Sequence, residues 1–173
     1  QLLAALAEVL DATLRRMNRD DSPVRELARI NEASRLFEEE IIRQFGSRPR
    51  WSCAVPTAAD GGVQRSGYPD LQIIDRESGR VSYLDPKLYR EDTGDSTFRS
   101  FYYEPQDTTG KITRDARHLV VGIAHDGNTG SWRFLRWRLV DMSAVRLRFK
   151  AEFQASNRDM YGVPPVATGA PGR

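Results

Sequence analysis

Two β-prone runs at residues 71–75 and 81–89 constrain the fold more than any other feature of the sequence. The first reads Leu-Gln-Ile-Ile-Asp, the second reads Val-Ser-Tyr-Leu-Asp-Pro-Lys-Leu-Tyr, and the turn between them contains Gly79. Two such runs joined by a short glycine turn predict an antiparallel hairpin. The sequence therefore predicts a sheet that includes this hairpin near the middle of the chain.

Helical periodicity dominates the chain before residue 50. Apolar residues at helical spacing predict an amphipathic helix over residues 2–18. Ser22-Pro23 then offers an N-cap and a first-turn proline, and Gly46 is a natural helix end, so a second helix is expected between them. The apolar positions of the two helices are Leu3, Leu6, Leu10, Leu14 and Met17, then Val24, Leu27, Ile30, Phe37, Ile41 and Phe45.

The pattern after residue 50 favours strands. Residues 51–57 form a short β-prone run, residues 119–124 a continuous apolar run typical of a buried strand, and residues 132–140 a return strand after the turn at Asp126-Gly127-Asn128. Residues 91–117 fit a helix or an irregular lid equally well. Residues 145–153 alternate apolar and basic side chains, which favours a strand, although a helix also fits. We expect one α/β domain over residues 1–161 with a central mixed sheet flanked by helices, and a disordered tail over residues 162–173 that is rich in proline, glycine and alanine.

Composition excludes several classes of protein. Apolar residues make up 39% of the chain and charged residues 29%, and no apolar stretch is long enough to span a membrane. The single cysteine, Cys53, excludes an internal disulfide and a multi-cysteine zinc site, and fits a reducing compartment. A cytoplasmic location is therefore favoured, although secretion stays open because the chain begins at Gln1, and an upstream domain is an expectation for the same reason.

Three charged residues of the hairpin region form the candidate site. Side chains alternate along a strand, so Asp85 and Lys87 point to the same face, and Asp70 stands at the start of the preceding strand. Two carboxylates can hold a hard divalent cation, which polarises a phosphoryl oxygen and activates water, while a lysine offsets developing charge. Taken singly, each residue is better explained as a surface group, whereas the three together favour phosphodiester hydrolysis.

Pro69-Asp70 and Asp85-Pro86-Lys87 resemble the PD-(D/E)XK motif of the restriction-endonuclease-like superfamily. The resemblance covers roughly residues 30–125 and implies that superfamily's α/β core. It also implies that Asp70 and Asp85 bind Mg²⁺ or Mn²⁺ with the Pro86 carbonyl as a further ligand, and that Lys87 assists the nucleophile. A glutamate on the preceding helix completes the pattern, and Glu38 is preferred over Glu39 and Glu32. The implied function is a metal-dependent nuclease, with DNA favoured over RNA as its substrate, and symmetric cutting would require a homodimer.

Other charged residues leave alternatives open. Arg146, Arg148 and Lys150 would track a phosphate backbone or keep a strand edge soluble. Three further residues between the strands are open candidates for helpers near the site: Lys111, Asp115 and Arg117. Lysine is rare here, since only Lys87, Lys111 and Lys150 are lysines among the 26 basic residues. The competing hypotheses are a nucleic-acid-binding module of the same fold without catalysis, and a domain that neither binds nor cuts nucleic acid.

Overall fold

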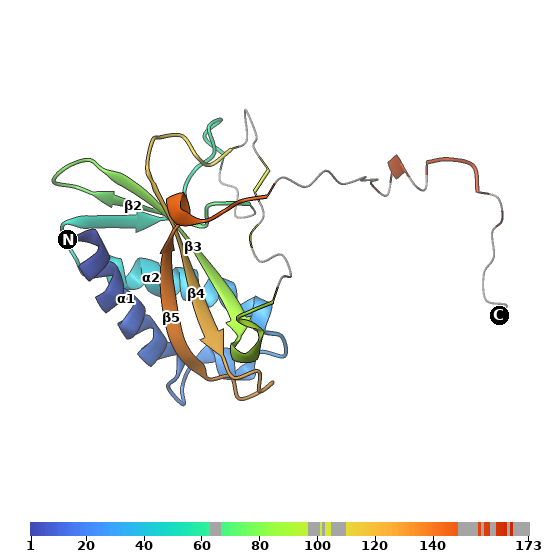
Figure 1. Ribbon diagram of the computed structural model, residues 1–173, viewed down its shortest axis with the longest axis horizontal. Helices are drawn as coiled ribbons and strands as arrows, with labels where there is room; N and C mark the ends of the chain where they lie inside the picture. The colour runs from blue at the N-terminus through green and yellow to red at the C-terminus, as the bar shows by residue number, and fades with distance from the viewer. Residues whose placement is uncertain are drawn as a thin grey trace.

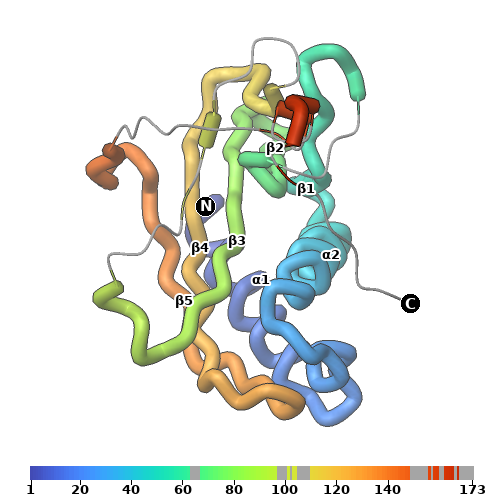
Figure 2. The backbone as a smooth tube through the Cα atoms, turned by 90° about the vertical axis from the view of Figure 1, so that its right-hand side faces the viewer, coloured from blue at the N-terminus to red at the C-terminus, as the bar shows by residue number. Residues whose placement is uncertain are grey.

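A five-stranded mixed sheet with two α-helices on one face forms the described part of the chain (Figures 1 and 2). The computed structural model of the 173-residue protein describes residues 1–62, 67–96, 101, 103–104, 110–148, 156, 158–159, 162–165 and 167. The elements are α1 (Leu2–Met17), α2 (Ala33–Gly46), β1 (Trp51–Ala54), β2 (Leu71–Asp75), β3 (Val81–Arg90), β4 (Arg117–His125) and β5 (Phe134–Asp141), with short 3-10 helices at Pro23–Glu26, Ile30–Glu32, Glu91–Thr93 and Met142–Ala144. The strand order β1-β2-β3-β4-β5 follows the sequence.

The hairpin predicted from the sequence is confirmed as β2 and β3, which pair antiparallel with Leu71 opposite Leu84. Strand β3 pairs in parallel with β4, and every other neighbouring pair is antiparallel. The β4–β5 hairpin is confirmed as well. The expectation of a mixed α/β sheet flanked by helices is therefore correct, and both helices lie on the same side of it.

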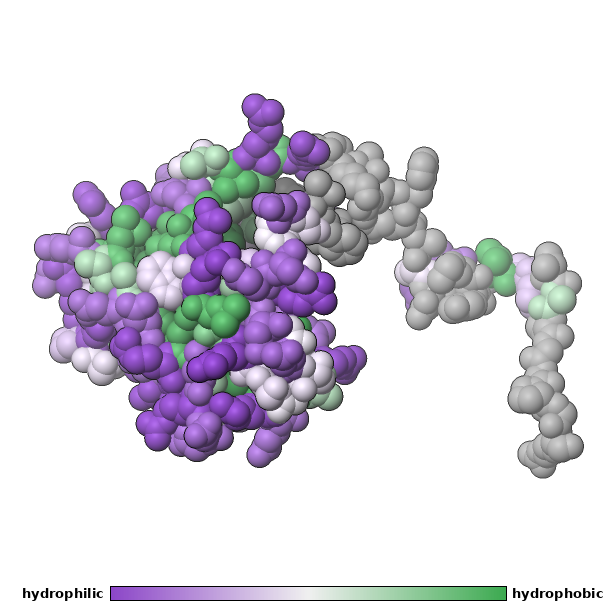
Figure 3. Space-filling view, turned by 60° about the horizontal axis from the view of Figure 1, so that its bottom comes forward, coloured by the Kyte–Doolittle hydropathy of each residue, from purple (hydrophilic) through white to green (hydrophobic). Residues whose placement is uncertain are grey.

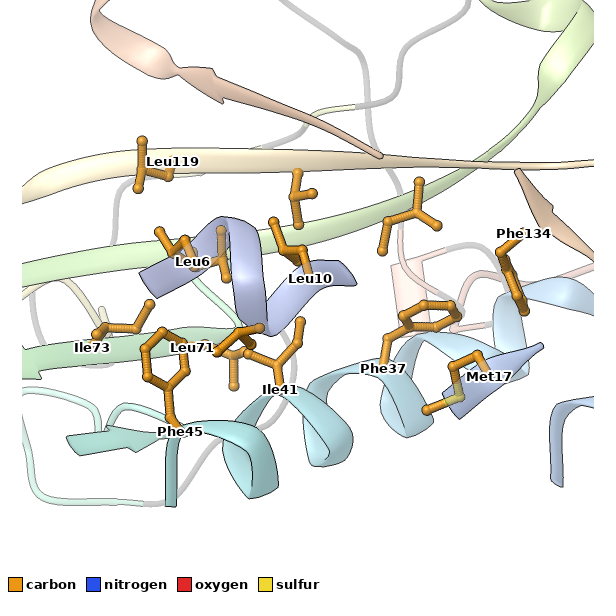
Figure 4. Close-up of a cluster of buried hydrophobic side chains, with 14 of the residues drawn as sticks. Leu6, Leu10, Met17, Phe37, Ile41, Phe45, Leu71, Ile73, Leu119 and Phe134 are labelled. Atoms are coloured by element: carbon orange, nitrogen blue, oxygen red, sulfur yellow. The ribbon is translucent and has the colours of Figure 1, made fainter. Parts of the chain in front are cut away.

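The hydrophobic core lies between the two helices and that face of the sheet. Leu6 and Leu10 of α1 meet Phe37, Ile41 and Phe45 of α2, and all five are fully buried (Figure 4). Their helical spacing places them on one stripe of each helix, which is why these sequences fold as helices against a sheet. The sheet residues that complete the cluster are Leu71, Ile73, Leu84, Leu119, Val121, Ile123 and Phe134.

The second helix is shorter than the sequence predicts. The segment after Ser22-Pro23 forms only a 3-10 turn, and the backbone is extended at Leu27 (ψ 130°) and at Arg29 (ψ 134°) before α2 begins at Ala33. The indole of Trp132 donates a hydrogen bond of 2.9 Å to the carbonyl of Leu27. This tertiary contact uses a carbonyl that a continuous helix would have paired internally, so the prediction of a helix from Ser22 to Gly46 is wrong over its first turns.

The turn between β2 and β3 is organised around Asp75. Its carboxylate accepts two hydrogen bonds from Arg50, at 3.0 and 2.7 Å, and one each from the Ser78 hydroxyl and the Glu77 amide. Gly79 completes the turn with a positive φ of 69°, which explains why glycine stands there. The Arg50 guanidinium and these donors lower the pKa of Asp75 from 3.8 to about 2.

This lowered pKa predicts how Asp75 contributes to acid stability. A group whose pKa is lower in the folded state stabilises it fully above its ordinary pKa, and this stabilisation disappears as the pH falls through the folded pKa. We therefore expect the difference in unfolding free energy between the wild type and Asp75→Asn to shrink between pH 4 and pH 2. Urea unfolding at several pH values measures this, and a difference that stays constant over this range would contradict the prediction.

The end of the described chain departs from the sequence-based expectation. Residues 145–148 form no strand, and residues 149–153 of the predicted basic strand lie outside the described residues, as does most of the tail over residues 162–173. No helix in the described ranges is long and apolar enough to cross a membrane. Polar and charged side chains cover most of the face in Figure 3, with hydrophobic patches between them.

Candidate active site

Asp70 and Asp85 face each other where the β2–β3 pairing ends. Leu71 is paired with Leu84, so the next position outward brings Asp70 opposite Asp85. Leu84 belongs to the core beneath the helices, and side chains alternate, so both carboxyl groups lie on the opposite face of the sheet. Only 1% of the Asp85 side chain is exposed, which argues against a solvated surface pair.

Lys87 joins the two carboxyl groups from the same face of β3. Its Nζ lies 2.6 Å from Oδ2 of Asp85, and about a third of its side chain is exposed. The contact is an ion pair, and Oδ2 has no hydrogen-bond partner in the described part of the chain. Pro86, between them, lies beyond the last residue that pairs with β2, where β3 keeps only β4 as a neighbour and a missing N–H is tolerated.

The electrostatics of this pair favour a positive ligand. Burial, followed by the charge and hydrogen bond of the Asp85 carboxyl, raises the pKa of Asp70 from 3.8 to about 8. Lys87 opposes this shift only in part. Burial also raises the pKa of Tyr68, with Asp85 and Asp70 adding to the effect. Two adjacent carboxyl groups in a buried position therefore retain negative charge only at a cost, which a cation would offset.

Glu38 of α2 contributes to the same electrostatic site. Its charge raises the pKa of Asp70, as the smallest of the causes that act on it, and raises the pKa of Lys111 as well. The neighbouring Glu40 is more buried, but it accepts hydrogen bonds from Arg43 and Gln44. Arg35 pairs with Glu39 at 2.7 Å on the exposed side. Among Glu38, Glu39 and Glu40, the sequence favoured Glu38, and Glu38 is the one whose charge acts on Asp70.

The sequence alone did not decide whether Lys111 belongs to the site. Its side chain is only 3% exposed, and burial lowers its pKa while Asp70, Glu38 and Asp85 raise it. The sequence signal that could have selected it is the rarity of lysine, since the chain has only three lysines. The other two open candidates do not join the cluster: Asp115 is exposed, and Arg117 pairs with Asp141 at 3.2 Å.

The register of the sheet adds a basic residue that the sequence did not suggest. Lys87 is paired with Gly122, and Gly122 with Arg138, so Arg138 stands two strands away in the same row and on the same face. Arg138 is exposed. Arg136 stands on the same face of β5, where it forms an ion pair with Glu91. Arg146 and Arg148 are exposed beyond β5, and Lys150 lies outside the described residues.

The donor set at the carboxyl pair fits a hard cation. Asp70 and Asp85 supply carboxylate oxygens from facing positions, and the buried Oδ2 of Asp85 lacks a well-formed hydrogen bond among described residues. No group of three or more histidine, cysteine or acidic ligands is found in the described ranges. A cation here would therefore rest on two carboxylates, completed by backbone oxygen or water, which is how Mg²⁺ is commonly held.

A hollow of about 680 Å³ lies elsewhere, at the beginnings of β3 and β4. Its lining includes Trp51, Arg80 and Ser82, and none of the acidic or lysine residues of the cluster. The chemistry-bearing side chains and this hollow are therefore separate features of the molecule.

The fold and the cluster define an α/β protein in which Asp70, just before β2, and Asp85 and Lys87 of β3 lie together on the face of the sheet opposite to the helices. This chain belongs to the MjaV family of type II restriction enzymes, because the sequence model of that family matches residues 1–164. It is 28% identical over 142 residues to the type II restriction enzyme MjaV of Methanocaldococcus jannaschii. The match covers 77% of this chain and 60% of that protein, so the chain spans about 60% of the length of its relative. No solved structure matches the chain.

Proposed function

We propose that this protein is a metal-dependent DNA endonuclease that hydrolyses phosphodiester bonds at the cluster of Asp70, Asp85 and Lys87. The observation that carries the proposal is the meeting of a buried carboxyl pair with the Lys87 ammonium, 2.6 Å from Asp85, in a member of a restriction enzyme family. Family membership favours the enzyme over the binding module without catalysis. We also infer that the mixed α/β sheet represents a restriction-endonuclease-like core.

The residues divide the chemistry between them. Asp70 and Asp85 would hold the cation, Mg²⁺ or Mn²⁺, and the Pro86 carbonyl would be a further oxygen donor. When bound, the cation would polarise a phosphoryl oxygen and lower the pKa of water beside it. Lys87 donates to the attacking water and to the phosphate, which orients the water and offsets the negative charge that develops during attack. The negative charge of Glu38 acts on Asp70 from α2.

Activity on plasmid DNA tests the proposal directly. The purified protein should cleave DNA when Mg²⁺ or Mn²⁺ is added, and EDTA should stop cleavage. Ca²⁺ should support binding with much less cleavage, since it takes more ligands at longer distances and is a poorer match for the site. A protein that binds DNA but never cuts it with either metal would overturn the proposal.

We propose that DNA lies across the face that carries Asp85, Lys87 and Arg138. Neighbouring strands are about 4.8 Å apart, so the Arg138 backbone lies roughly 10 Å from that of Lys87. A side chain at this offset reaches a phosphate next to the one being cut, whereas α1 and α2 are on the other face. A phosphate contact of this kind strengthens binding without reading the sequence.

Arg138→Ala is expected to weaken DNA binding without abolishing cleavage at saturating enzyme. Loss of one phosphate contact should reduce the magnitude of the slope of the logarithm of the DNA-binding constant against the logarithm of the salt concentration by about 1. Fluorescence anisotropy in Ca²⁺ over a salt series measures both affinity and slope. The control is Arg15→Ala on α1, an exposed arginine of the helical layer, which should leave binding unchanged. Equal effects of the two substitutions would place DNA elsewhere.

A further inference from the structure

We propose that Lys111 is a second phosphate-binding group of this active site, whose ammonium donates to a non-bridging oxygen of the phosphodiester being cut. The inference rests on the proposed endonuclease function and adds a residue from outside the Asp70–Asp85–Lys87 motif. Its physical basis is a buried ammonium that has no hydrogen-bond partner among the described residues, in a segment tied to Tyr83 of the strand that carries Asp85.

The Lys111 side chain is enclosed and unsatisfied. It is 3% exposed, and its Nζ has no hydrogen-bond partner among the described residues. An ammonium has three donors, and leaving them unpaired in the interior is costly, so a buried lysine normally meets acceptors. Burial lowers the pKa of Lys111, whereas the negative charges of Asp70, Glu38 and Asp85 raise it.

Backbone contacts fix the position of this lysine. It belongs to the connection between β3 and β4, and the flanking residues are tied to other parts of the molecule. The Ala59 amide donates to the Gly110 carbonyl at 3.0 Å, and the Thr113 amide donates to the Tyr83 hydroxyl at 3.2 Å. Tyr83 is fully buried in β3, two residues before Asp85. Lys111 is therefore anchored from both sides, as a positioned group requires.

The charges of the cluster support a phosphate as the missing acceptor. Glu38, Asp70 and Asp85 carry three negative charges when ionised, and Lys87 and Lys111 carry two positive charges. The net charge of the cluster is then −1. One divalent cation changes this net charge to +1, and the single negative charge of a phosphodiester neutralises it. Without Lys111 the loaded site would be neutral and would attract the phosphate less strongly. The lysine thus supplies the net positive charge that the substrate needs.

Lys111→Met tests this inference because it keeps the length of the side chain and removes the charge. Single-turnover cleavage should fall about 100-fold, as for the loss of one preorganised donor. Mn²⁺ should bind more tightly, by about 10-fold in a calorimetric titration without DNA, because a positive charge near the carboxylates is gone. Slower cleavage together with tighter Mn²⁺ binding distinguishes a phosphate-binding lysine from one that only supports the carboxylates.

The matched control is Arg114→Met, which removes one charge from an exposed position of the same segment and should change neither measurement. Circular dichroism checks folding, and Lys111→Gln replaces the methionine variant if that one does not fold. Cleavage within about 3-fold of wild type would overturn the inference, and so would a fall in cleavage accompanied by weaker Mn²⁺ binding.

A wild-type protein that does not cut DNA would overturn the proposed function rather than this inference. The inference would then be decided by the binding of a duplex oligonucleotide in Ca²⁺. Binding lost with Lys111→Met and kept with Arg114→Met would support it, and equal binding by both variants would overturn it.

Discussion

Asp85→Asn is expected to abolish DNA cleavage, with the single-turnover rate falling by about 10³-fold or more. Asp85 is 1% exposed and lies between Asp70 across the hairpin and Lys87 on its own strand. The amide keeps the shape of the side chain but removes the charge that would hold the cation. It also removes the partner of the Lys87 ammonium, so both halves of the site lose their function.

Metal binding and folding separate this effect from a general disruption. Asp85→Asn should lose calorimetric Mn²⁺ binding while it keeps the circular dichroism spectrum of the wild type, since it also removes the repulsion between two adjacent carboxyl groups. Asp20→Asn, a fully exposed aspartate after α1, is the control and should leave both cleavage and Mn²⁺ binding intact. Cleavage by Asp85→Asn within about 10-fold of wild type would show that the proposed metal site is wrong.

The elements that were predictable from the sequence are those with local signals. The helical stripe of α1, the β2–β3 hairpin with Gly79 and the β4–β5 pair each follow from periodicity and a nearby turn. The meeting of Asp70 and Asp85 was predictable for the same reason, because a hairpin joins neighbours in the sequence. The position of the proposed site was therefore partly visible in the order of the residues, whereas the family that the chain belongs to supports a nuclease and does not identify its residues.

The features that were not predictable depend on contacts between distant segments. The interruption before α2 involves Trp132, more than 100 residues from Leu27, which accepts its hydrogen bond. Arg138 joins the row of Lys87 only through the register of two strand pairs. The segment of Lys111 is fixed beside β3 by the hydrogen bond from the Thr113 amide to the hydroxyl of Tyr83, 30 residues earlier. No periodicity in the sequence encodes these arrangements, because each is set by packing of the whole sheet.

Phe37→Ala is expected to destabilise the protein by about 3–5 kcal/mol, the cost of removing a buried aromatic side chain and leaving a cavity. Phe37 is fully buried, and its ring packs edge-to-face on Phe134 with 4.7 Å between centroids. This contact joins α2 to β5 at the far side of the sheet from β1. A typical domain has a total stability of about 5–15 kcal/mol, so the loss is large.

Urea unfolding followed by circular dichroism measures the loss, and Leu3→Ala, half-exposed on α1, is the control, expected to change stability by about 0.5 kcal/mol or less. Because Glu38 follows Phe37 directly, a looser α2 should also move the glutamate relative to Asp70. The folded fraction of Phe37→Ala should therefore bind Mn²⁺ more weakly than wild type, whereas Leu3→Ala should bind it equally well. A loss of stability below about 1 kcal/mol would mean that Phe37 does not fix α2 on the sheet, and the placement of Glu38 would then need another cause.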